Sequence, residues 1–257
     1  MSRQLRAAAG APAGTSAPPS TPQPATVLEI MTTLGTARAH VYSGQIGPSH
    51  AHARRATLVL GHGAGGGVDA RDLAALAAAL PATGVDVVLV EQPWRVAGRQ
   101  VAGRPAGLDQ AWREVLADPA LRATAGLRGG NRLVCGGRSA GARVACRTAA
   151  AVGADAVVAL AFPLHPPGRA DDPGRSRAAE LSQVTCPVLV VQGSRDAFGM
   201  AHELTADGGA ALPAGARVVQ VPHADHGFAV PHRLQLPPDY AVDLVVTHVA
   251  RFLADLP

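Results

Sequence analysis

The sequence contains no lysine, so all 23 of its basic residues are arginine, and aromatic residues make up only 3% of its 257 positions. With so few aromatic side chains, the hydrophobic core has to be aliphatic. The arginines also lack neighbouring rings on which nucleic-acid bases stack. The net charge of +4 is therefore a weak sign of acidic partners, and nucleic acid is not expected to be one of them.

Cysteine is scarce, and long apolar runs are missing. Cys135, Cys146 and Cys186 all lie in apolar stretches, and an odd, buried set predicts reduced thiols in a cytoplasm rather than a disulfide framework. No uninterrupted apolar run approaches the ~18 residues of a membrane span. No continuous apolar stretch follows Arg3 and Arg6 before the first proline, so no signal peptide is predicted. We expect a cytoplasmic protein without a membrane partner.

The first 25 residues differ in composition from the rest of the chain. Residues 1–25 are rich in Ala, Pro, Ser, Thr and Gly and have no apolar period. Such a segment buries too little surface to offset the entropy lost on ordering, so we predict a disordered tail. Residues 26–257 have the length of one large domain and are predicted to fold as one.

The predicted domain alternates short apolar segments with segments of helical periodicity. Strands are predicted over 26–30, 36–42, 56–60, 85–90, 132–135, 156–162, 187–192 and 216–221. Helices are predicted over 69–80 with Asp69 as N-cap, over 109–116, over 140–151, and from Pro237-Pro238 onward. This alternation indicates an α/β fold with a doubly wound, mainly parallel sheet. Functional groups in such sheets lie beyond the carboxyl ends of the strands.

A serine occupies the turn between the strand over 132–135 and the next helix. Residues 137–141 read Gly-Arg-Ser-Ala-Gly, a G-x-S-x-G pattern. This pattern raises a serine hydroxyl out of a sharp strand-to-helix corner, and its glycines stand where strand and helix leave no room for side chains. In a chain so rich in glycine the pattern also arises by chance, and Ser139 then has the alternative role of capping the helix over 140–151.

Three other strand ends carry matching groups. The strand over 56–60 is followed by Gly-His-Gly-Ala-Gly-Gly-Gly at 61–67, a loop of small residues with exposed backbone N–H groups. Gly-Ser-Arg-Asp follows the strand over 187–192 and ends at Asp196. His-Ala-Asp-His-Gly-Phe follows the strand over 216–221 and contains His226. Nucleophile, acid and base thus occur in the order Ser, Asp, His, each one loop beyond a strand, which is the order of the α/β-hydrolases.

From about Thr26 to its end the chain resembles that superfamily. The His-Gly-Ala-Gly-Gly loop, the serine turn, Phe-Pro-Leu-His-Pro at 162–166 and Asp-His-Gly-Phe at 225–228 resemble its small, cap-less, dienelactone-hydrolase-like branch. That branch includes the hydrolase-like domain in a subunit of the nuclear non-specific-lethal chromatin complex. The chain departs from dienelactone hydrolases in one respect, because they use a cysteine nucleophile and this chain has Ser139. Dienelactone chemistry itself is therefore not expected.

Resemblance and chemistry assign the same three roles. Ser139 is expected to attack an acyl carbonyl, and His226 to accept its proton and return it to the leaving group. Asp196 is expected to hold the imidazole tautomer and to stabilise the imidazolium. Asp196 has an alternative role as cap of a helix near Phe198. His223 competes with His226 as base, but the Gly-Phe that follows His226 matches the superfamily's usual His-Gly-Phe.

The neighbours of these groups receive further predictions. The backbone N–H groups of Ala64 and Ala140 are expected to bind the oxyanion, with Gly65 as the alternative to Ala64. His62 is a candidate substrate-binding residue and alternatively packs its loop. Arg138 contacts an acidic substrate or is an ion-paired structural arginine. Asp225, adjacent to the base, is assigned a structural role. No histidine spacing suggests a metal site, and the proposed chemistry requires no cofactor.

A dinucleotide-binding oxidoreductase is a rival interpretation. Residues 61–66 fit G-x-G-x-x-G after a strand, and Glu91 ends the next strand. Glu91 falls later than the usual ~20 residues, and neither Tyr42 nor Tyr240 has a lysine partner, since the chain has none. This interpretation also leaves Ser139 unexplained. A second rival is a binding module that retains the hydrolase fold without activity.

We therefore predict a serine hydrolase that cleaves a small ester, with thioester and amide as alternatives, through an acyl-enzyme. The interval between the strands over 156–162 and 187–192 is short and rich in Pro, Gly and Arg. It leaves no room for a large cap, so a shallow, open site for small acyl groups is expected. The sequence leaves the physiological substrate and the oligomeric state undetermined.

Overall fold

The computed structural model describes residues 23–45, 56–205, 212–213 and 215–257. The tail predicted over residues 1–25 lies outside this part of the chain except for its last three residues.

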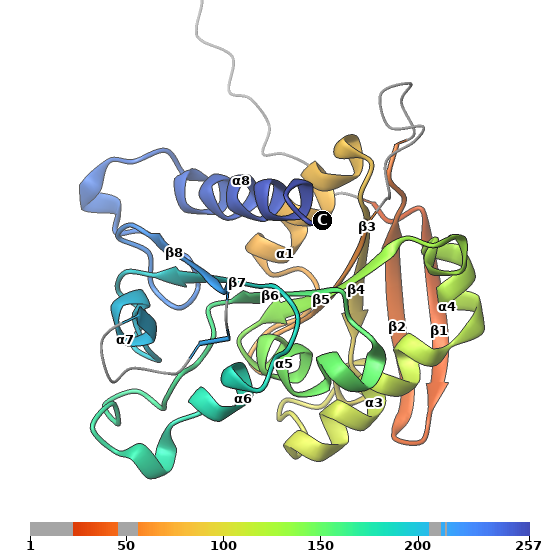
Figure 1. Cartoon of the computed structure of the whole chain (residues 1–257), viewed down its shortest axis with the longest axis horizontal. Coiled ribbons are helices and arrows are strands. Elements are labelled where there is room, and N and C mark those ends of the chain that lie inside the picture. The colour runs from red at the N-terminus through yellow and green to blue at the C-terminus, as the bar shows by residue number, and fades with distance from the viewer. Residues whose placement is uncertain (1–22, 46–55, 206–211, 214) are drawn as a thin grey trace, which may run out of the picture.

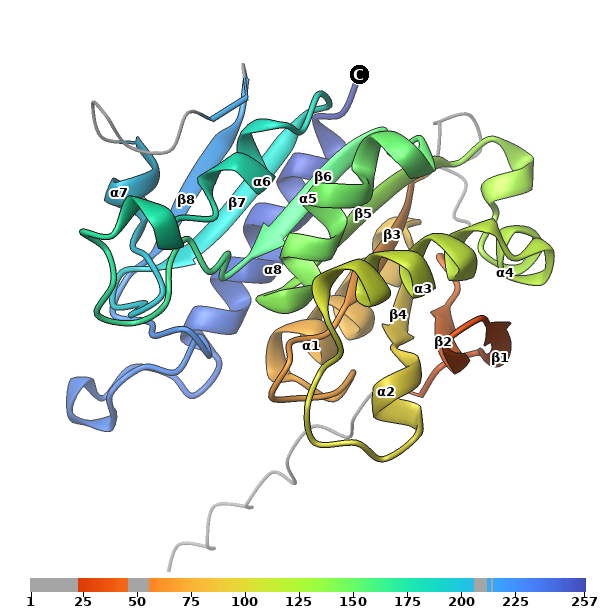
Figure 2. The same cartoon turned by 90° about the horizontal axis from the view of Figure 1, so that it is seen from below.

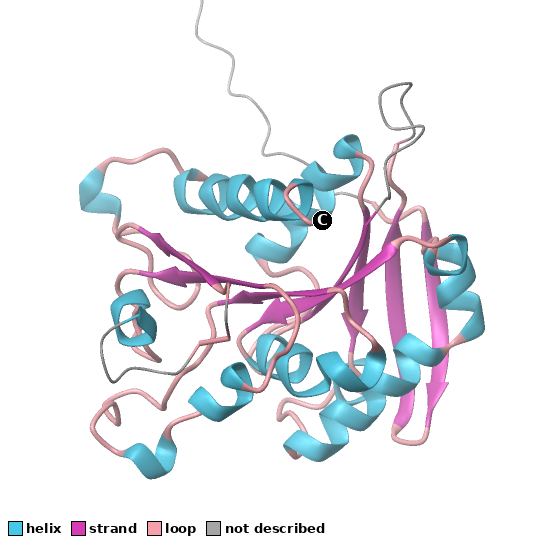
Figure 3. Ribbon diagram, in the orientation of Figure 1, coloured by secondary structure: helices cyan, strands magenta, loops and turns pink. Residues whose placement is uncertain are grey.

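Within this part of the chain, eight strands form one sheet in the order β1-β2-β4-β3-β5-β6-β7-β8 (Figures 1 and 3). They are β1 Thr26–Thr32, β2 Gly35–Tyr42, β3 Ala56–Gly61, β4 Asp86–Glu91, β5 Arg132–Arg138, β6 Ala156–Leu160, β7 Val188–Gly193 and β8 Arg217–Val221. The β1–β2 and β2–β4 pairs are antiparallel, and every pair from β4 to β8 is parallel. The predicted mainly parallel sheet is confirmed.

Helices cover both faces of the sheet. They are α1 Arg71–Ala79, α2 Pro93–Val96, α3 Pro105–Ala117, α4 Pro119–Thr124, α5 Ala140–Val152, α6 Ala178–Ser182, α7 Ala201–Thr205 and α8 Tyr240–Ala254. Helices α1 and α8 lie on one face, while α3, α5 and α6 lie on the other (Figures 1 and 2). The arrangement is doubly wound, as predicted.

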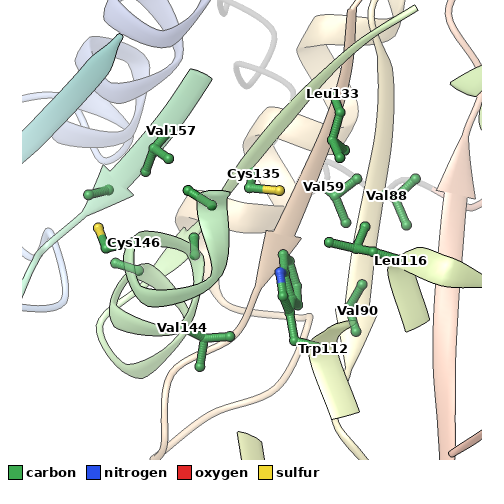
Figure 4. Close-up of a cluster of buried hydrophobic side chains, with 14 of the residues drawn as sticks. Val59, Val88, Val90, Trp112, Leu116, Leu133, Cys135, Val144, Cys146 and Val157 are labelled. Atoms are coloured by element: carbon green, nitrogen blue, oxygen red, sulfur yellow. The ribbon is translucent and has the colours of Figure 1, made fainter. Parts of the chain in front are cut away.

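Alternation along the buried strands divides the core into two layers. In β3, Leu58 and Leu60 face the layer under α1 and α8, whereas Val59 faces the layer under α3 and α5, because successive side chains of a strand point to opposite faces. Trp112 of α3 fills the second layer (Figure 4). Both layers are almost entirely aliphatic, as the composition requires.

Three predicted helix starts are wrong. Helix α1 begins at Arg71, its N-cap residue is Ala70, and no side-chain cap is present, so Asp69 does not cap it. Helix α3 begins at Pro105 rather than at residue 109, because proline suits the first helical turn, where its missing N–H is not needed. Helix α8 begins at Tyr240, after a turn in which the Tyr240 N–H donates to the carbonyl of Pro237.

Strand β6 also ends two residues earlier than predicted. Ala161 adopts a φ of 45°, and this left-handed conformation breaks the strand after Leu160. From there to β7 the chain contains only a 3-10 turn at Pro173–Arg175 and the five residues of α6, so no large cap is present in this interval. Among the described residues, no helix combines the length and apolar character needed to cross a membrane.

The three cysteines are unpaired, as expected. Cys135 and Cys146 are buried, whereas Cys186 is partly exposed, so the expectation of a fully buried set is wrong for Cys186. Burial raises the pKa of the Cys135 and Cys146 thiols far above its ordinary value.

Gly141 is predicted to be a position where a single methyl group is costly. A Cβ there would collide with the backbone of Gly61, so Gly141→Ala should lower the free energy of unfolding by about 1–3 kcal/mol. Gly129 has open space around its Cβ position and provides the control, because Gly129→Ala should stay within about 0.5 kcal/mol of wild type. Urea denaturation measures both. Equal stability of the two variants would contradict the tight contact.

Candidate active site

Ser139 occupies a strained turn between β5 and α5. Its backbone has a φ of 53° and a ψ of −110°, a conformation that is costly for a residue with a side chain. The turn is held because Gly141 packs against the backbone of Gly61 and the Ser139 N–H donates to the carbonyl of Leu160 at 2.9 Å. Although Ser139 stands at the N-cap position of α5, its side chain caps no backbone group. The hydroxyl is therefore available for another partner.

That partner is the imidazole of His226. Ser139 Oγ lies 3.0 Å from His226 Nε2, and His226 Nδ1 lies 2.8 and 3.0 Å from the two oxygens of Asp196. A carboxylate only accepts hydrogen bonds, so Nδ1 carries the hydrogen and Nε2 is left to accept from the hydroxyl. Three segments from the ends of β5, β7 and β8 thus meet in one continuous chain of polar contacts.

Asp196 is 1% exposed and is surrounded by donors. Besides His226, its oxygens accept from the side-chain amide of Gln192 at 2.9 Å and from the backbone N–H of Phe198 at 2.8 Å. The contact with Phe198 is a local turn and not a helix cap, since the next helix begins at Ala201. A buried carboxylate needs such partners to remain charged.

Sequence reasoning did not identify two residues that orient these groups. The Phe198 ring stacks on the His226 imidazole with centroids 4.3 Å apart. Gln192 is fully buried, and its side chain also bonds both backbone groups of Phe162 and the carbonyl of Gly199. A glutamine inside the apolar run of β7 was a visible signal for such a role, whereas nothing in the sequence marks Phe198.

The competing residues of the β8 loop lie elsewhere. His223 is exposed, and the hydrogen bonds described for it involve only its backbone. Asp225 accepts from the backbone N–H groups of Gly227 and Ala229 at 2.8 and 2.9 Å, so its carboxylate shapes the loop that carries His226.

Ser139 opens onto a cleft of about 430 Å³. Its lining includes Ala64, Gly65 and Ala140, and the described residues supply no hydrogen-bond acceptor for any of these three backbone N–H groups. Unpaired amides beside a serine hydroxyl suit a developing negative charge. The contacts do not distinguish Ala64 from Gly65.

Arg138 is engaged by protein groups. Its Nη2 donates to the backbone carbonyl of His226 at 2.9 Å, and its Nε lies 3.3 Å from Asp72 Oδ2. That contact is an ion pair without good hydrogen-bond geometry, since the oxygen has no hydrogen-bond partner. Burial raises the pKa of Asp72, and the charge of Arg138 opposes this shift. The arrangement favours the structural, ion-paired role of Arg138 over contact with an acidic substrate.

His62 is also engaged within its loop. It is 3% exposed, its Nδ1 lies 2.9 Å from the carbonyl of Gly63, and its Nε2 accepts from the N–H of Gln92 at 3.2 Å. The imidazole ring of His62 packs against the indole ring of Trp94. These contacts favour the loop-packing role. No group of three His, Cys, Asp or Glu side chains that would hold a metal occurs in the described part of the chain.

A model of the alpha/beta hydrolase domain matches residues 54–254, which is most of the chain. The chain belongs to the alpha/beta hydrolase family. Among curated proteins, none matches the sequence of this alpha/beta hydrolase.

Solved structures share the fold of this alpha/beta hydrolase. XC6422 from Xanthomonas campestris, described as an α/β serine hydrolase without lid, matches with a TM-score of 0.66 and 23% identity over 93% of this chain and 100% of its own. Est1E from Butyrivibrio proteoclasticus matches with a TM-score of 0.64 and 16% identity, over 90% of this chain and 98% of its own. A dienelactone hydrolase from Anabaena variabilis matches with a TM-score of 0.63 and 15% identity, over 91% of this chain and 99% of its own. The predicted likeness to the cap-less branch is confirmed at the level of the fold.

Removing Arg138 should leave the buried carboxylate of Asp72 without its ion-pair partner. Arg138→Leu is expected to lower the free energy of unfolding by about 3–5 kcal/mol, because Asp72 then keeps its desolvation cost without its partner. Adding Asp72→Asn should restore part of the loss, since a neutral amide is cheaper to bury. Urea denaturation of wild type, single and double variants tests this. A double variant no more stable than Arg138→Leu would contradict the assignment.

His62 should make stability depend on pH. Burial lowers the pKa of His62 below its ordinary 6.5. As the pH falls through 6.5, the imidazole of His62 is therefore protonated in the unfolded chain but stays neutral in the folded protein. The contribution of His62 to the free energy of unfolding is therefore fully present above this pH and declines below it, by at most about 1.4 kcal/mol per pH unit. Between about pH 7.5 and 5.5 the decline measured by urea denaturation should be smaller in His62→Gln. Burial also lowers the pKa of His40, but His40 is present in both wild type and His62→Gln and affects them equally. Parallel plots of the free energy of unfolding against pH for the two proteins would refute the prediction.

Proposed function

We propose that this alpha/beta hydrolase is a serine hydrolase that cleaves small esters through an acyl-enzyme. The observation that carries the proposal is the unbroken contact from the Ser139 hydroxyl through His226 to Asp196, beside backbone amides that have no partner in the described structure. A serine hydroxyl is a poor nucleophile without a base, and here a base with a fixed tautomer lies within hydrogen-bond distance.

The first half of the reaction forms the acyl-enzyme. Ser139 Oγ attacks the carbonyl carbon of the ester while His226 Nε2 takes the hydroxyl proton. The carbonyl oxygen becomes an oxyanion and receives hydrogen bonds from the N–H groups of Ala140 and of Ala64 or Gly65, each commonly worth about 3 kcal/mol in the transition state. As the bond to the leaving oxygen breaks, His226 passes the proton to that oxygen and the alcohol departs.

The second half repeats these steps with water. His226 takes a proton from a water molecule, whose oxygen attacks the acyl carbon and displaces Ser139 Oγ. The proton returns to Ser139, and the carboxylic acid leaves. Asp196 stays ionised throughout and stabilises the imidazolium in both halves.

The surroundings support a small acyl ester rather than a long lipid. The cleft is open, the β6–β7 interval carries no large cap, and apolar contact is offered by Pro163 and Phe198. Thioesters and amides share the same acyl chemistry and are alternatives. The three unpaired thiols support a reducing compartment such as the cytoplasm.

The dinucleotide interpretation loses support from the placement of the glycine loop. Gly63 packs against the side chains of Arg138 and Ser139, and α1 begins only at Arg71. The glycine pattern therefore does not open the helix directly, as a dinucleotide fingerprint does.

A fluorophosphonate probe and a panel of p-nitrophenyl esters test the proposal. Wild type should be labelled and should hydrolyse acetyl and butyryl esters faster than long-chain esters. Ser139→Ala should lose labelling and about 10⁴-fold or more of kcat. Ser182→Ala, which alters an exposed serine of α6, should behave like wild type.

Two outcomes would overturn the proposal. Absence of both labelling and turnover in folded wild type would favour a binding module that retains the fold. Labelling that persists in Ser139→Ala would place the nucleophile elsewhere.

A further inference from the structure

The cleft beside Ser139 is lined by charge of one sign. Its described lining contains three arginines, Arg138, Arg143 and Arg177, and no acidic side chain. The remaining lining residues are glycines, alanines, proline, phenylalanine and the Ser139–His226 pair. A cleft of this kind attracts anions unless each arginine is neutralised from behind.

Two of the three arginines are neutralised. Arg138 pairs with Asp72. Arg143 donates to both carboxylate oxygens of Glu180, through Nε at 2.8 Å and through Nη2 at 2.5 Å. Their charges are therefore largely satisfied within the protein.

Glu180 is shared with a further arginine. Arg147 donates to Glu180 at 2.9 Å and to both oxygens of Asp109 at 2.6 and 2.8 Å. Arg143 and Arg147 together thus balance Glu180 and Asp109. No carboxylate in this network is left for another cation.

Arg177 is the cation left over. In the described structure no carboxylate lies within 4.0 Å of its guanidinium, and the side chain donates only to the backbone carbonyl of Pro163 at 3.0 Å. Its backbone N–H is anchored on the carbonyl of Leu164 at 2.7 Å. The residue is partly buried. Burial, followed by the neighbouring charge of Arg143, lowers the pKa of Arg177, and the charge of Glu180 opposes this shift only in part, so the positive charge of Arg177 is incompletely compensated.

We propose that Arg177 selects esters that carry a carboxylate in addition to the ester group. The inference rests on the proposed function. Guanidinium presents a planar fork of donors that matches a carboxylate, and the single bond to Pro163 leaves most of that fork unused. The substrate carboxylate would supply the missing negative charge while the ester carbonyl lies at Ser139. The substrate carboxylate bound by Arg177 is unchanged by the reaction. Water and the ester group yield an alcohol and a new carboxylic acid.

Matched esters test the charge selectivity on either side of the ester bond. Para-acetoxybenzoate and para-acetoxybenzamide differ by a charge on the leaving group, and monomethyl glutarate and methyl glutaramate differ by a charge on the acyl group. Wild type should prefer the anionic member of at least one pair. Arg177→Gln should lower the anionic-to-neutral ratio of kcat/KM in that pair about tenfold, mainly through KM, and Arg177→Lys should retain part of it.

The control variant is Arg175→Gln. Arg175 is exposed, lies two residues from Arg177 and does not line the cleft, so the variant makes the same change in net charge. It should leave the ratio as in wild type. An equal loss in both variants would assign the effect to net charge and overturn the inference. So would a wild-type ratio near one in both pairs.

A binding measurement separates this inference from the proposed function. Calorimetry of Ser139→Ala with para-acetoxybenzoate and with monomethyl glutarate reports affinity without turnover, and the double variant Ser139→Ala/Arg177→Gln should bind at least one of these two anions about tenfold more weakly. Arg177-dependent binding with no hydrolysis of any ester by wild type would refute the proposed function and keep the anion site. Hydrolysis without charge selectivity, together with equal binding by the two variants, would refute the anion site and keep the hydrolase.

Discussion

The close approach of two backbones, at Gly61 and Gly141, is the constraint on which the site depends. Helix α5 starts so near the end of β3 that no side chain fits between them. The chain can leave β5 and enter α5 only through a sharp corner, and Ser139 takes the strained conformation at that corner. The strain is stored in the native state and is offset by the packing of β5 and α5 around it. Exposure of the hydroxyl toward His226 is a consequence of this geometry.

The site also depends on the hydrogen-bond donors that surround the buried carboxylate of Asp196. Asp196 has donors from Gln192, Phe198 and His226, and these donors also limit where the imidazole can stand. Arg138 reaches across from the serine turn to the backbone carbonyl of His226. The loops after β5, β7 and β8 therefore hold one another in place, and the polar groups of the site serve as its scaffold.

Sequence reasoning succeeded where local pattern and sheet geometry suffice. Ser139, Asp196 and His226 were expected to lie close together because the carboxyl ends of parallel strands share one edge of the sheet, and their distances agree with that expectation. Reasoning from apolar spacing placed the start of α3 at residue 109 rather than Pro105. The stacking of Phe198 on His226 depends on how two loops fold over each other, which no local pattern records.

Charge pairing shows the same limit, and it bears on how this cleft distinguishes its ligands. In the sequence every arginine looks alike. Among the described residues, Arg143 and Arg147 share two carboxylates, whereas Arg177 pairs with none. An uncapped cleft encloses little of a ligand, so shape alone discriminates weakly there. For the proposed hydrolase, fixed charges beside Ser139 are then the source of selectivity, and Arg177, whose guanidinium donates to the carbonyl of Pro163 after β6, supplies such a charge.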